Sequence, residues 1–186
     1  MSDDRAAAIL SYWLEELGPK LWYARPDPAR DAEIAARFGA DLEAAAAGRC
    51  RGWLARPDYA LALMILLDQF PRHIHRGRAE AFATDALALA AAGQAIAQGH
   101  DVKIAEPERQ FFYLPFMHSE RLADQERCVR LVLLNLTETG AQTLIHSAKH
   151  REVIRRFGRF PSRNAALGRA DTERERAYRA ERGYMS

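Results

Sequence analysis

The chain has 186 residues, a length typical of one domain with a single substantial core. Hydrophobic residues make up 48% of it, charged residues make up 28%, and the formal net charge is only +2, so its charge gives no argument for a nucleic-acid or membrane partner. The longest apolar run, residues 60–67, is far too short for a bilayer, which needs about 20 residues. The N-terminus lacks a signal-peptide pattern and the two cysteines lie far apart, so we expect a cytoplasmic protein with reduced thiols.

The first half of the chain shows helical periodicity throughout. Asp58 is the expected N-cap of the third helix, and Gly48 is the expected C-cap of the second. Residues 60–67 of the third helix are apolar on every side, which predicts a buried central helix. The helices expected in this half span residues 4–17, 29–47, 59–70 and 79–98.

The second half continues the same pattern, interrupted by prolines and glycines. Ser119 is the expected cap of one helix, and Thr172 with Glu175 forms the capping-box pattern at the start of the last helix. The helices expected here span residues 108–114, 120–138 and 141–157, followed by a charged helix from residue 172.

We therefore predict an all-α fold of about seven to nine helices in a single domain over residues 1–186. No alternating strand pattern persists in the sequence. Successive helices joined by short loops favour antiparallel neighbours, and hence a bundle or a stack of helical hairpins. The sequence shows no internal repeat at a fixed period.

Residues 155–169 carry five arginines and no acidic residue. Arginine forks bind carboxylates and phosphates through paired hydrogen bonds. In one interpretation these arginines leave one or two guanidinium groups available to a small anionic ligand. Nucleic-acid binding through the arginines with Phe157 and Phe160 is a weaker alternative, because the whole chain is not strongly basic. In the other interpretation they neutralise the carboxylates of Asp68, Asp85, Glu108 and Glu120.

Asp68 lies in the last turn of the most apolar helix, where a buried carboxylate needs a partner. Arg72 and an arginine from residues 155–169 are equal candidates for that partner. The pair is then either a structural ion pair or part of a ligand site. His118 and Glu120 flank the start of another helix, where they serve either as a cap with an ion pair or as part of a cleft.

His146 and His150 lie four residues apart on one helix, on the face that carries Val153 and Ile154, so we expect both imidazoles to face inward or toward a cleft rather than bulk water. Such a pair can bind zinc with a third ligand from His118 or Glu120. The chain lacks an H-E-x-x-H motif and a second ligand pair at zinc-site spacing, and it has no phosphate-binding glycine loop. We therefore predict no metal and no cofactor, and we expect buried histidines hydrogen-bonded to carboxylates.

Six motifs along the chain resemble the DUF924 family, a family of unknown function. They are LSYWL at 10–14, KLWY at 20–23, LDQFPRHIHRG at 67–77, AFATDALALA at 81–90, ERQFFYLPFMHSE at 108–120 and HREVIRRFGRFPSRNAALGR at 150–169. The resemblance implies a tetratricopeptide-like stack of antiparallel helical hairpins. Two positions depart from the family pattern: Ser162 stands where histidine is usual, and Arg30 where phenylalanine is common. The matched polar positions are Asp68, Gln69, Arg72, Asp85, Glu108, Arg109, His118, Ser119, Glu120, His150, Arg156, Arg159, Arg163, Asn164 and Arg169.

We predict a polar pocket that binds a small anionic ligand or an acidic peptide end, with walls formed by Asp68, Arg72, His118, Glu120, His150 and the loop 156–169. Arg159 and Arg163 would hold the anion, and His118 and His150 would donate hydrogen bonds. One alternative is a hydrolase-type enzyme in which either histidine acts as general base beside Glu120 or Asp68. The other is a protein-interaction scaffold without a small ligand, and the sequence makes no prediction of oligomeric state. The predicted site residues are Asp68, Arg72, His118, Glu120, His150, Arg156, Arg159, Arg163, Asn164 and Arg169.

Overall fold

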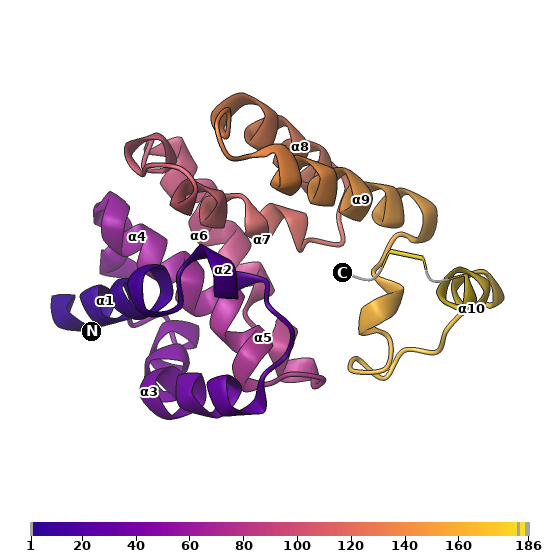
Figure 1. Ribbon diagram of the computed structural model, residues 1–186, viewed down its shortest axis with the longest axis horizontal. Coiled ribbons are helices and arrows are strands. Elements are labelled where there is room, and N and C mark those ends of the chain that lie inside the picture. The colour runs from indigo at the N-terminus through magenta and orange to yellow at the C-terminus, as the bar shows by residue number, and fades with distance from the viewer. Residues whose placement is uncertain (1, 182, 185–186) are drawn as a thin grey trace.

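The computed structural model describes residues 2–181 and 183–184, and this part of the chain is helical without a β-strand (Figure 1), which confirms the all-α prediction. The first half contains α1 (Asp3–Leu10), α2 (Pro19–Trp22), α3 (Pro28–Ala46), α4 (Pro57–Met64), α5 (Phe70–Ile74) and α6 (Asp85–Ala97). The second half contains α7 (Leu114–Met117), α8 (Leu122–Asn135), α9 (Ala141–Phe157) and α10 (Glu173–Ala180). Short 3₁₀ turns and two π-helical stretches, η1 (Ser11–Leu17) and η3 (Ile65–Gln69), link them.

A single buried helical path runs through α4, η3 and α5 and forms the centre of the molecule. Counting this path as one helix leaves nine helical rods among the described residues, within the predicted seven to nine. Two predictions about its ends were wrong. Asp58 is not the N-cap, because Pro57 already occupies the first turn, where its missing N–H is not needed. Pro71 does not end the helix but lies in the first turn of α5.

The hydrogen bonds around Pro71 explain why the helix continues past it. A proline cannot donate to the carbonyl four residues earlier, which here belongs to Leu67. The Thr84 hydroxyl donates to that carbonyl instead, at 2.6 Å, and the Arg72 side chain donates to the Asp68 carbonyl at 2.6 Å. The widened π stretch η3 therefore remains hydrogen-bonded while it places the side chains of Asp68 and Gln69.

Several predicted boundaries differ from the structure in the connecting regions. The segment expected as one helix over 79–98 begins with a 3₁₀ turn, η4 (Ala79–Phe82), before α6. Ser119 does not cap α8, because α8 begins three residues later; its hydroxyl accepts from the Arg121 N–H and donates to Asp124. The capping box of Thr172 and Glu175 on α10 is confirmed. The C-cap of α3 is Ala47 rather than the predicted Gly48, which follows it in the left-handed conformation.

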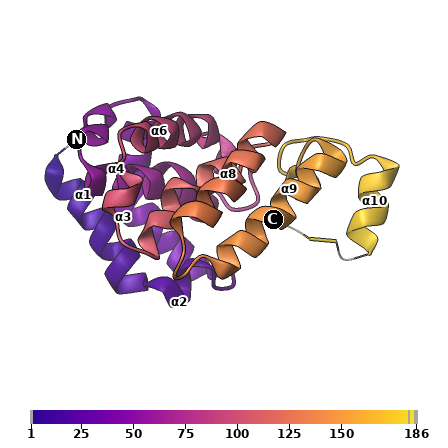
Figure 2. The same cartoon turned by 90° about the horizontal axis from the view of Figure 1, so that it is seen from above.

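The main hydrophobic core lies between Ala6 and Leu136, and α8 and α9 lie side by side along one edge of it (Figures 1 and 2). A smaller apolar cluster of Val153, Ile154 and Phe160 lies near the end of α9, with Phe157, Tyr178 and Tyr184 packed against it. We call residues 158–181, which include α10, the C-terminal arm, and the part of the chain before them the body. Figure 2 shows α9 leading from the body to this arm, with α10 outermost. The single-domain prediction and the tetratricopeptide-like comparison stay predictions.

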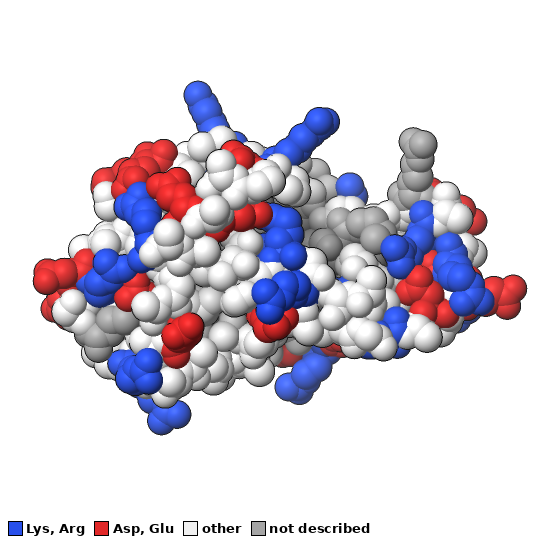
Figure 3. Space-filling view, turned by 90° about the horizontal axis from the view of Figure 1, so that it is seen from below, with Lys and Arg blue, Asp and Glu red and all other residues white. Residues whose placement is uncertain are grey.

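Surface charges and helix hydropathy agree with the expectations from composition. On the face shown in Figure 3, acidic and basic side chains are interspersed, so electrostatic effects act locally. Within the described part of the chain, no helix combines the length and the apolar character needed to cross a membrane.

Candidate functional site

A buried aspartate and a histidine form the centre of the candidate site. Asp68, on the π stretch of the central helix, is fully buried, and its Oδ1 atom lies 2.7 Å from His118 Nδ1. His118 follows α7, and its side chain is 15% exposed. The Gln69 amide donates to the other Asp68 oxygen at 2.6 Å. Because a carboxylate can only accept, the His118 proton resides on Nδ1 and its Nε2 atom carries a lone pair.

Two arginines and a second aspartate surround this pair. Arg72 lies 3.0 Å from Asp85 and 3.6 Å from Asp68, so the close partners of Asp68 are His118 and the arginine on its own helix. Arg163 extends from the arm to donate to Asp85 at 3.0 Å and to the His118 carbonyl at 2.9 Å. We name Asp68, Arg72, Asp85, His118 and Arg163 the junction cluster, because it joins the body to the arm.

Aromatic rings enclose the Arg163 guanidinium. Its carbon lies 4.7 Å from the Phe82 ring centre and 4.5 Å from that of Phe160. Burial, together with the charge of Arg72, lowers the pKa of Arg163 to about 10, so it stays a cation at neutral pH. Arg163 is thus a fixed partner of Asp85 and a support for the His118 main chain.

His150 lies beside the junction cluster, with its ring centre 6.2 Å from that of His118. Its Nδ1 atom lies 2.9 Å from the His146 carbonyl, which can only accept, so Nδ1 carries the proton here too. The ring of His150 contacts Phe160 and Tyr184 edge to face. Neither His118 nor His150 has a hydrogen bond to its Nε2 atom among the described residues.

Burial and neighbouring charges set the charge states of His118, His150 and Asp68. It lowers the pKa of His150 to about 3, with smaller contributions from His118 and Arg163. Burial and the charge of Arg72 lower the pKa of His118 more than Asp68 raises it. Burial alone would raise the pKa of Asp68, but His118, Arg72 and Gln69 together lower it to about 2. At neutral pH the centre therefore contains an ionised Asp68 and two neutral imidazoles.

The predicted residues Glu120, Arg159, Asn164 and Arg169 form hydrogen bonds within the arm or between the arm and the body. Arg169 forms two hydrogen bonds to Glu120, at 2.8 and 2.9 Å, and one to the side chain of the buried Asn164. Arg159 forms two hydrogen bonds to the buried Glu175, at 2.6 and 2.7 Å. Both arginines are thus engaged by carboxylates in the manner of the ion-pair interpretation.

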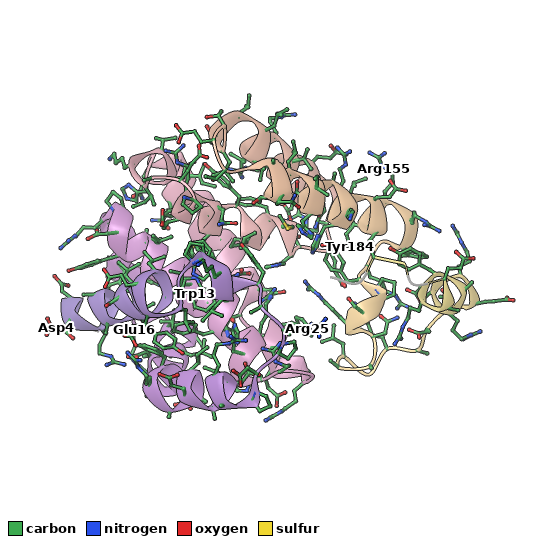
Figure 4. The ribbon with its side chains drawn as sticks, in the orientation of Figure 1. Asp4, Trp13, Glu16, Arg25, Arg155 and Tyr184 are labelled. Atoms are coloured by element: carbon green, nitrogen blue, oxygen red, sulfur yellow. The ribbon has the colours of Figure 1, made fainter. Side chains whose placement is uncertain are left out.

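The predicted site residue Arg156 lies apart from the junction cluster, and so does His146, which was expected to lie on the inner face of its helix. Arg156 has no carboxylate partner among the described residues and lies over the rings of Phe157 and Tyr178. His146 is exposed, and its Nδ1 atom lies 2.7 Å from the Tyr184 hydroxyl, so the prediction that it faces inward was wrong. A helical wheel averages over whole turns and does not show that the inner face of α9 narrows to Ser147 and His150 there. Figure 4 places Tyr184 between α9 and the arm.

The structure adds polar residues that were absent from the predicted site. The Tyr23 hydroxyl donates to Gln110 at 2.7 Å, and Thr143 on α9 shares the same acceptor. Tyr23 is 63% exposed, but desolvation of its hydroxyl at the contact with Gln110 and the charge of Asp68 raise its pKa. The KLWY motif contained this residue, but only tertiary contacts bring it near Asp68.

Two surface depressions lie away from the junction cluster. One, of about 540 Å³, lies beside the end of α3 and α6 and is lined mainly by alanine and leucine. The other, of about 260 Å³, lies between α3, α5 and the 3₁₀ turn before α6. Across the described residues, no group of three or more His, Cys, Asp or Glu side chains is arranged to hold a metal ion.

Comparisons with known proteins identify relatives without a known activity. A family model described as "Bacterial protein of unknown function (DUF924)" matches residues 9–183. A solved structure of a protein of unknown function from Agrobacterium tumefaciens is 44% identical in sequence and superposes with a TM-score of 0.88, over 95% of this chain and 97% of that one. No functionally curated protein matches the chain.

Proposed function

The chain belongs to the DUF924 family, and we propose that it is a hydrolase-type enzyme in which His118 is the general base and Asp68 orients it. One observation carries this proposal: the 2.7 Å contact between His118 Nδ1 and a fully buried Asp68 carboxylate. This contact fixes the tautomer, so the unprotonated Nε2 atom is the one that remains to accept a proton.

The charge states support this role. A general base must be unprotonated at working pH, and burial keeps the pKa of His118 below its usual value of about 6.5. When Nε2 takes a proton, the new imidazolium lies against the ionised Asp68, which stabilises it. Gln69 and Arg72 hold Asp68 in place, and Arg163 holds the His118 main chain.

The reaction that follows is attack by water on an electrophilic substrate. His118 Nε2 removes a proton while the water oxygen forms a bond to the electrophilic atom. The bond to the leaving group then breaks, and the leaving group takes the proton back from Nε2. His118 is thereby restored to its neutral form beside Asp68.

A second candidate function is the binding of a small anionic ligand or an acidic peptide end. Arg156 favours it, because this cation has no carboxylate partner among the described residues. The other arginines argue against it, since Arg72 and Arg163 share Asp85, Arg159 holds Glu175, and Arg169 holds Glu120; an anion would have to displace these carboxylates.

The test is a panel of chromogenic carboxylic esters, anilides, phosphate esters and glycosides, assayed with the wild-type protein and His118→Asn. An asparagine amide can still donate to Asp68 but offers no base at the Nε2 position. We expect kcat/KM to fall by about 10²–10⁴-fold in this variant. His75→Asn, which changes a histidine beside the smaller depression, should retain wild-type activity.

Hydrolysis that survives His118→Asn would contradict the proposal. No turnover on any ester class, combined with a rise in Tm on adding phosphate or small dicarboxylates that Arg156→Ala abolishes, would favour the anion-binding function instead.

A further inference from the structure

His150 carries the same chemical group as His118 and lies next to it, with the two ring centres 6.2 Å apart. Its Nδ1–H is engaged by the His146 carbonyl, so its Nε2 atom is a hydrogen-bond acceptor. The two imidazoles lie on opposite sides of the boundary between α7 and α9, with ring planes at 58° to each other. Two acceptors cannot hydrogen-bond each other, so whatever lies between them must supply the hydrogens.

The distance between the ring centres of His118 and His150 indicates whether a water or a metal ion fits between them. A water oxygen that donates to two Nε2 atoms at about 2.8 Å, with its bond angle of about 105°, sets the two ring centres about 6 Å apart. The observed spacing is 6.2 Å. A metal ion bound tetrahedrally by the same two atoms at about 2.0–2.1 Å would draw the ring centres to about 5 Å. The observed spacing is therefore the one that a shared water requires when both Nε2 atoms point to it, and it is longer than a shared metal would require.

Resting on the proposed function, we infer that His118 and His150 hold one nucleophilic water between their Nε2 atoms. Both hydrogens of that water are then engaged, and its lone pairs point away from the two rings toward the substrate. His118 removes the proton, while His150 positions the water without itself changing charge.

This arrangement narrows the reaction class. A nucleophile that satisfies two acceptors must carry at least two hydrogens on one atom, as water and primary amines do. An alcohol has only one hydroxyl hydrogen and would leave one Nε2 atom unpaired, at a free-energy cost. The site therefore favours hydrolysis over transfer to an alcohol, and its substrate is an electrophile such as an ester, amide or phosphoryl group.

The variants His150→Asn and His150→Gln separate the role of the Nδ1 donor of His150 from that of its Nε2 acceptor. In His150→Asn the amide nitrogen takes the place of Nδ1 and can still donate to the His146 carbonyl, but the Nε2 acceptor is lost. In His150→Gln an amide oxygen takes the place of Nε2, so the acceptor is kept and the carbonyl contact is lost. The two variants are therefore matched controls for each other.

The experiment combines long-range ¹H–¹⁵N NMR at pH 7.5 with high-resolution crystal structures of the full chain. Single His→Asn variants at positions 118 and 150 assign the imidazole signals. We expect lone-pair Nε2 signals for both histidines in the wild-type protein. We also expect one water within hydrogen-bond distance of both Nε2 atoms, lost in His150→Asn and kept in His150→Gln.

The outcomes separate this inference from the proposed function. A His150 that carries its proton on Nε2, or two separate waters that each contact one ring, would overturn the shared water while leaving His118 intact as a base. A His118 that is protonated at pH 7.5, or that carries its proton on Nε2, would overturn both. If one His→Asn variant does not fold, through-bond assignment of the wild-type protein identifies that imidazole, so the measurement still decides.

Discussion

Burial of neutral imidazoles ties the stability of this protein to pH. The pKa of His150 is lowered by burial to about 3, whereas an unfolded histidine titrates near 6.5. Between these values the unfolded chain binds more protons than the folded protein, so the free energy of unfolding decreases as pH falls. The contribution is fully present above about pH 6.5 and is lost as the pH falls through the folded pKa.

Replacement of His150 by asparagine should flatten this dependence. In the wild-type protein, His150 alone should account for a loss of roughly 1.5 kcal/mol between pH 6.5 and 5.0, and His118 should add to it. His150→Asn should lose less stability over that interval, whatever its stability at pH 7.5. Urea unfolding at pH 8.5, 7.5, 6.5 and 5.0 measures this. Equal slopes for the two proteins below pH 6.5 would show that His150 is charged in the folded state.

Among the helices, α9 depends on its terminating glycine. Gly158 ends α9 with φ +69°, in the left-handed region that most side chains resist. This turn directs the chain from α9 into the arm, where Phe160 and Arg163 reach the site. The end of one helix thus determines whether Arg163 lies near Asp85.

Alanine substitutions at two glycines should therefore have opposite signs. Gly158→Ala should destabilise the protein by about 1 kcal/mol, because in the left-handed conformation the alanine Cβ atom lies too close to the following carbonyl oxygen. Gly93→Ala, inside α6 with open space around the position, should stabilise it by about 0.5–1 kcal/mol. Thermal or urea unfolding of both variants tests the pair. A neutral Gly158→Ala would mean that the chain can leave α9 by another conformation.

At the scale of the whole molecule, ion pairs connect the body to the arm. Among the described residues, the buried residues of the main core end at Leu136, with Leu144 of α9 packed against them, and the apolar cluster around Phe160 is small. Arg163 contacts Asp85, and Arg169 contacts Glu120, so two arginines of the arm are fixed by carboxylates of the body. Arm and body should consequently open with different free energies.

Removing one of these contacts should loosen the arm before the body. In Arg169→Ala we expect amides of α10 to exchange with deuterium at least about tenfold faster, because two charge-assisted hydrogen bonds are lost, while amides of α4 keep their protection. Arg155→Ala removes only an exposed pair with Glu126 and serves as the control, with α10 exchange unchanged within about threefold. Equal acceleration in α4 and α10 would show that the chain opens as one unit.

The features that could be predicted from the sequence are those set by the local periodicity of apolar residues and by local charge. The range of α9 and the capping box of Thr172 and Glu175 follow from residues close together in the chain, and both were predicted correctly. It was also possible to expect that the arginines of residues 155–169 meet carboxylates. Which carboxylate each one meets depends on how the arm folds back, so Glu108 was named as a partner although no contact of it with an arginine is seen among the described residues.

The contacts within the candidate site were harder to predict from the sequence. Asp68 and His118 were both candidates, but their mutual contact depends on the π stretch that turns Asp68 toward α7. Ser119 was assigned to the wrong helix position because a serine before an acidic residue resembles a cap whether or not the helix starts there. Tyr23 lies in the KLWY motif, but nothing in the sequence connected it with the site, since it approaches the centre only through the fold.

The order in which the chain is made gives the arm a further consequence. A ribosome releases the protein from its N-terminus, so every residue of the main core, which ends at Leu136, emerges before the arm does. The core can fold while Arg163 and Arg169 are still unmade, and the junction cluster is completed only by these late residues. A chain that stops before Arg163 would therefore contain every buried residue of the main core but lack the contacts of Arg163 with Asp85 and with the His118 carbonyl, so the junction cluster is the last part of the fold to be completed.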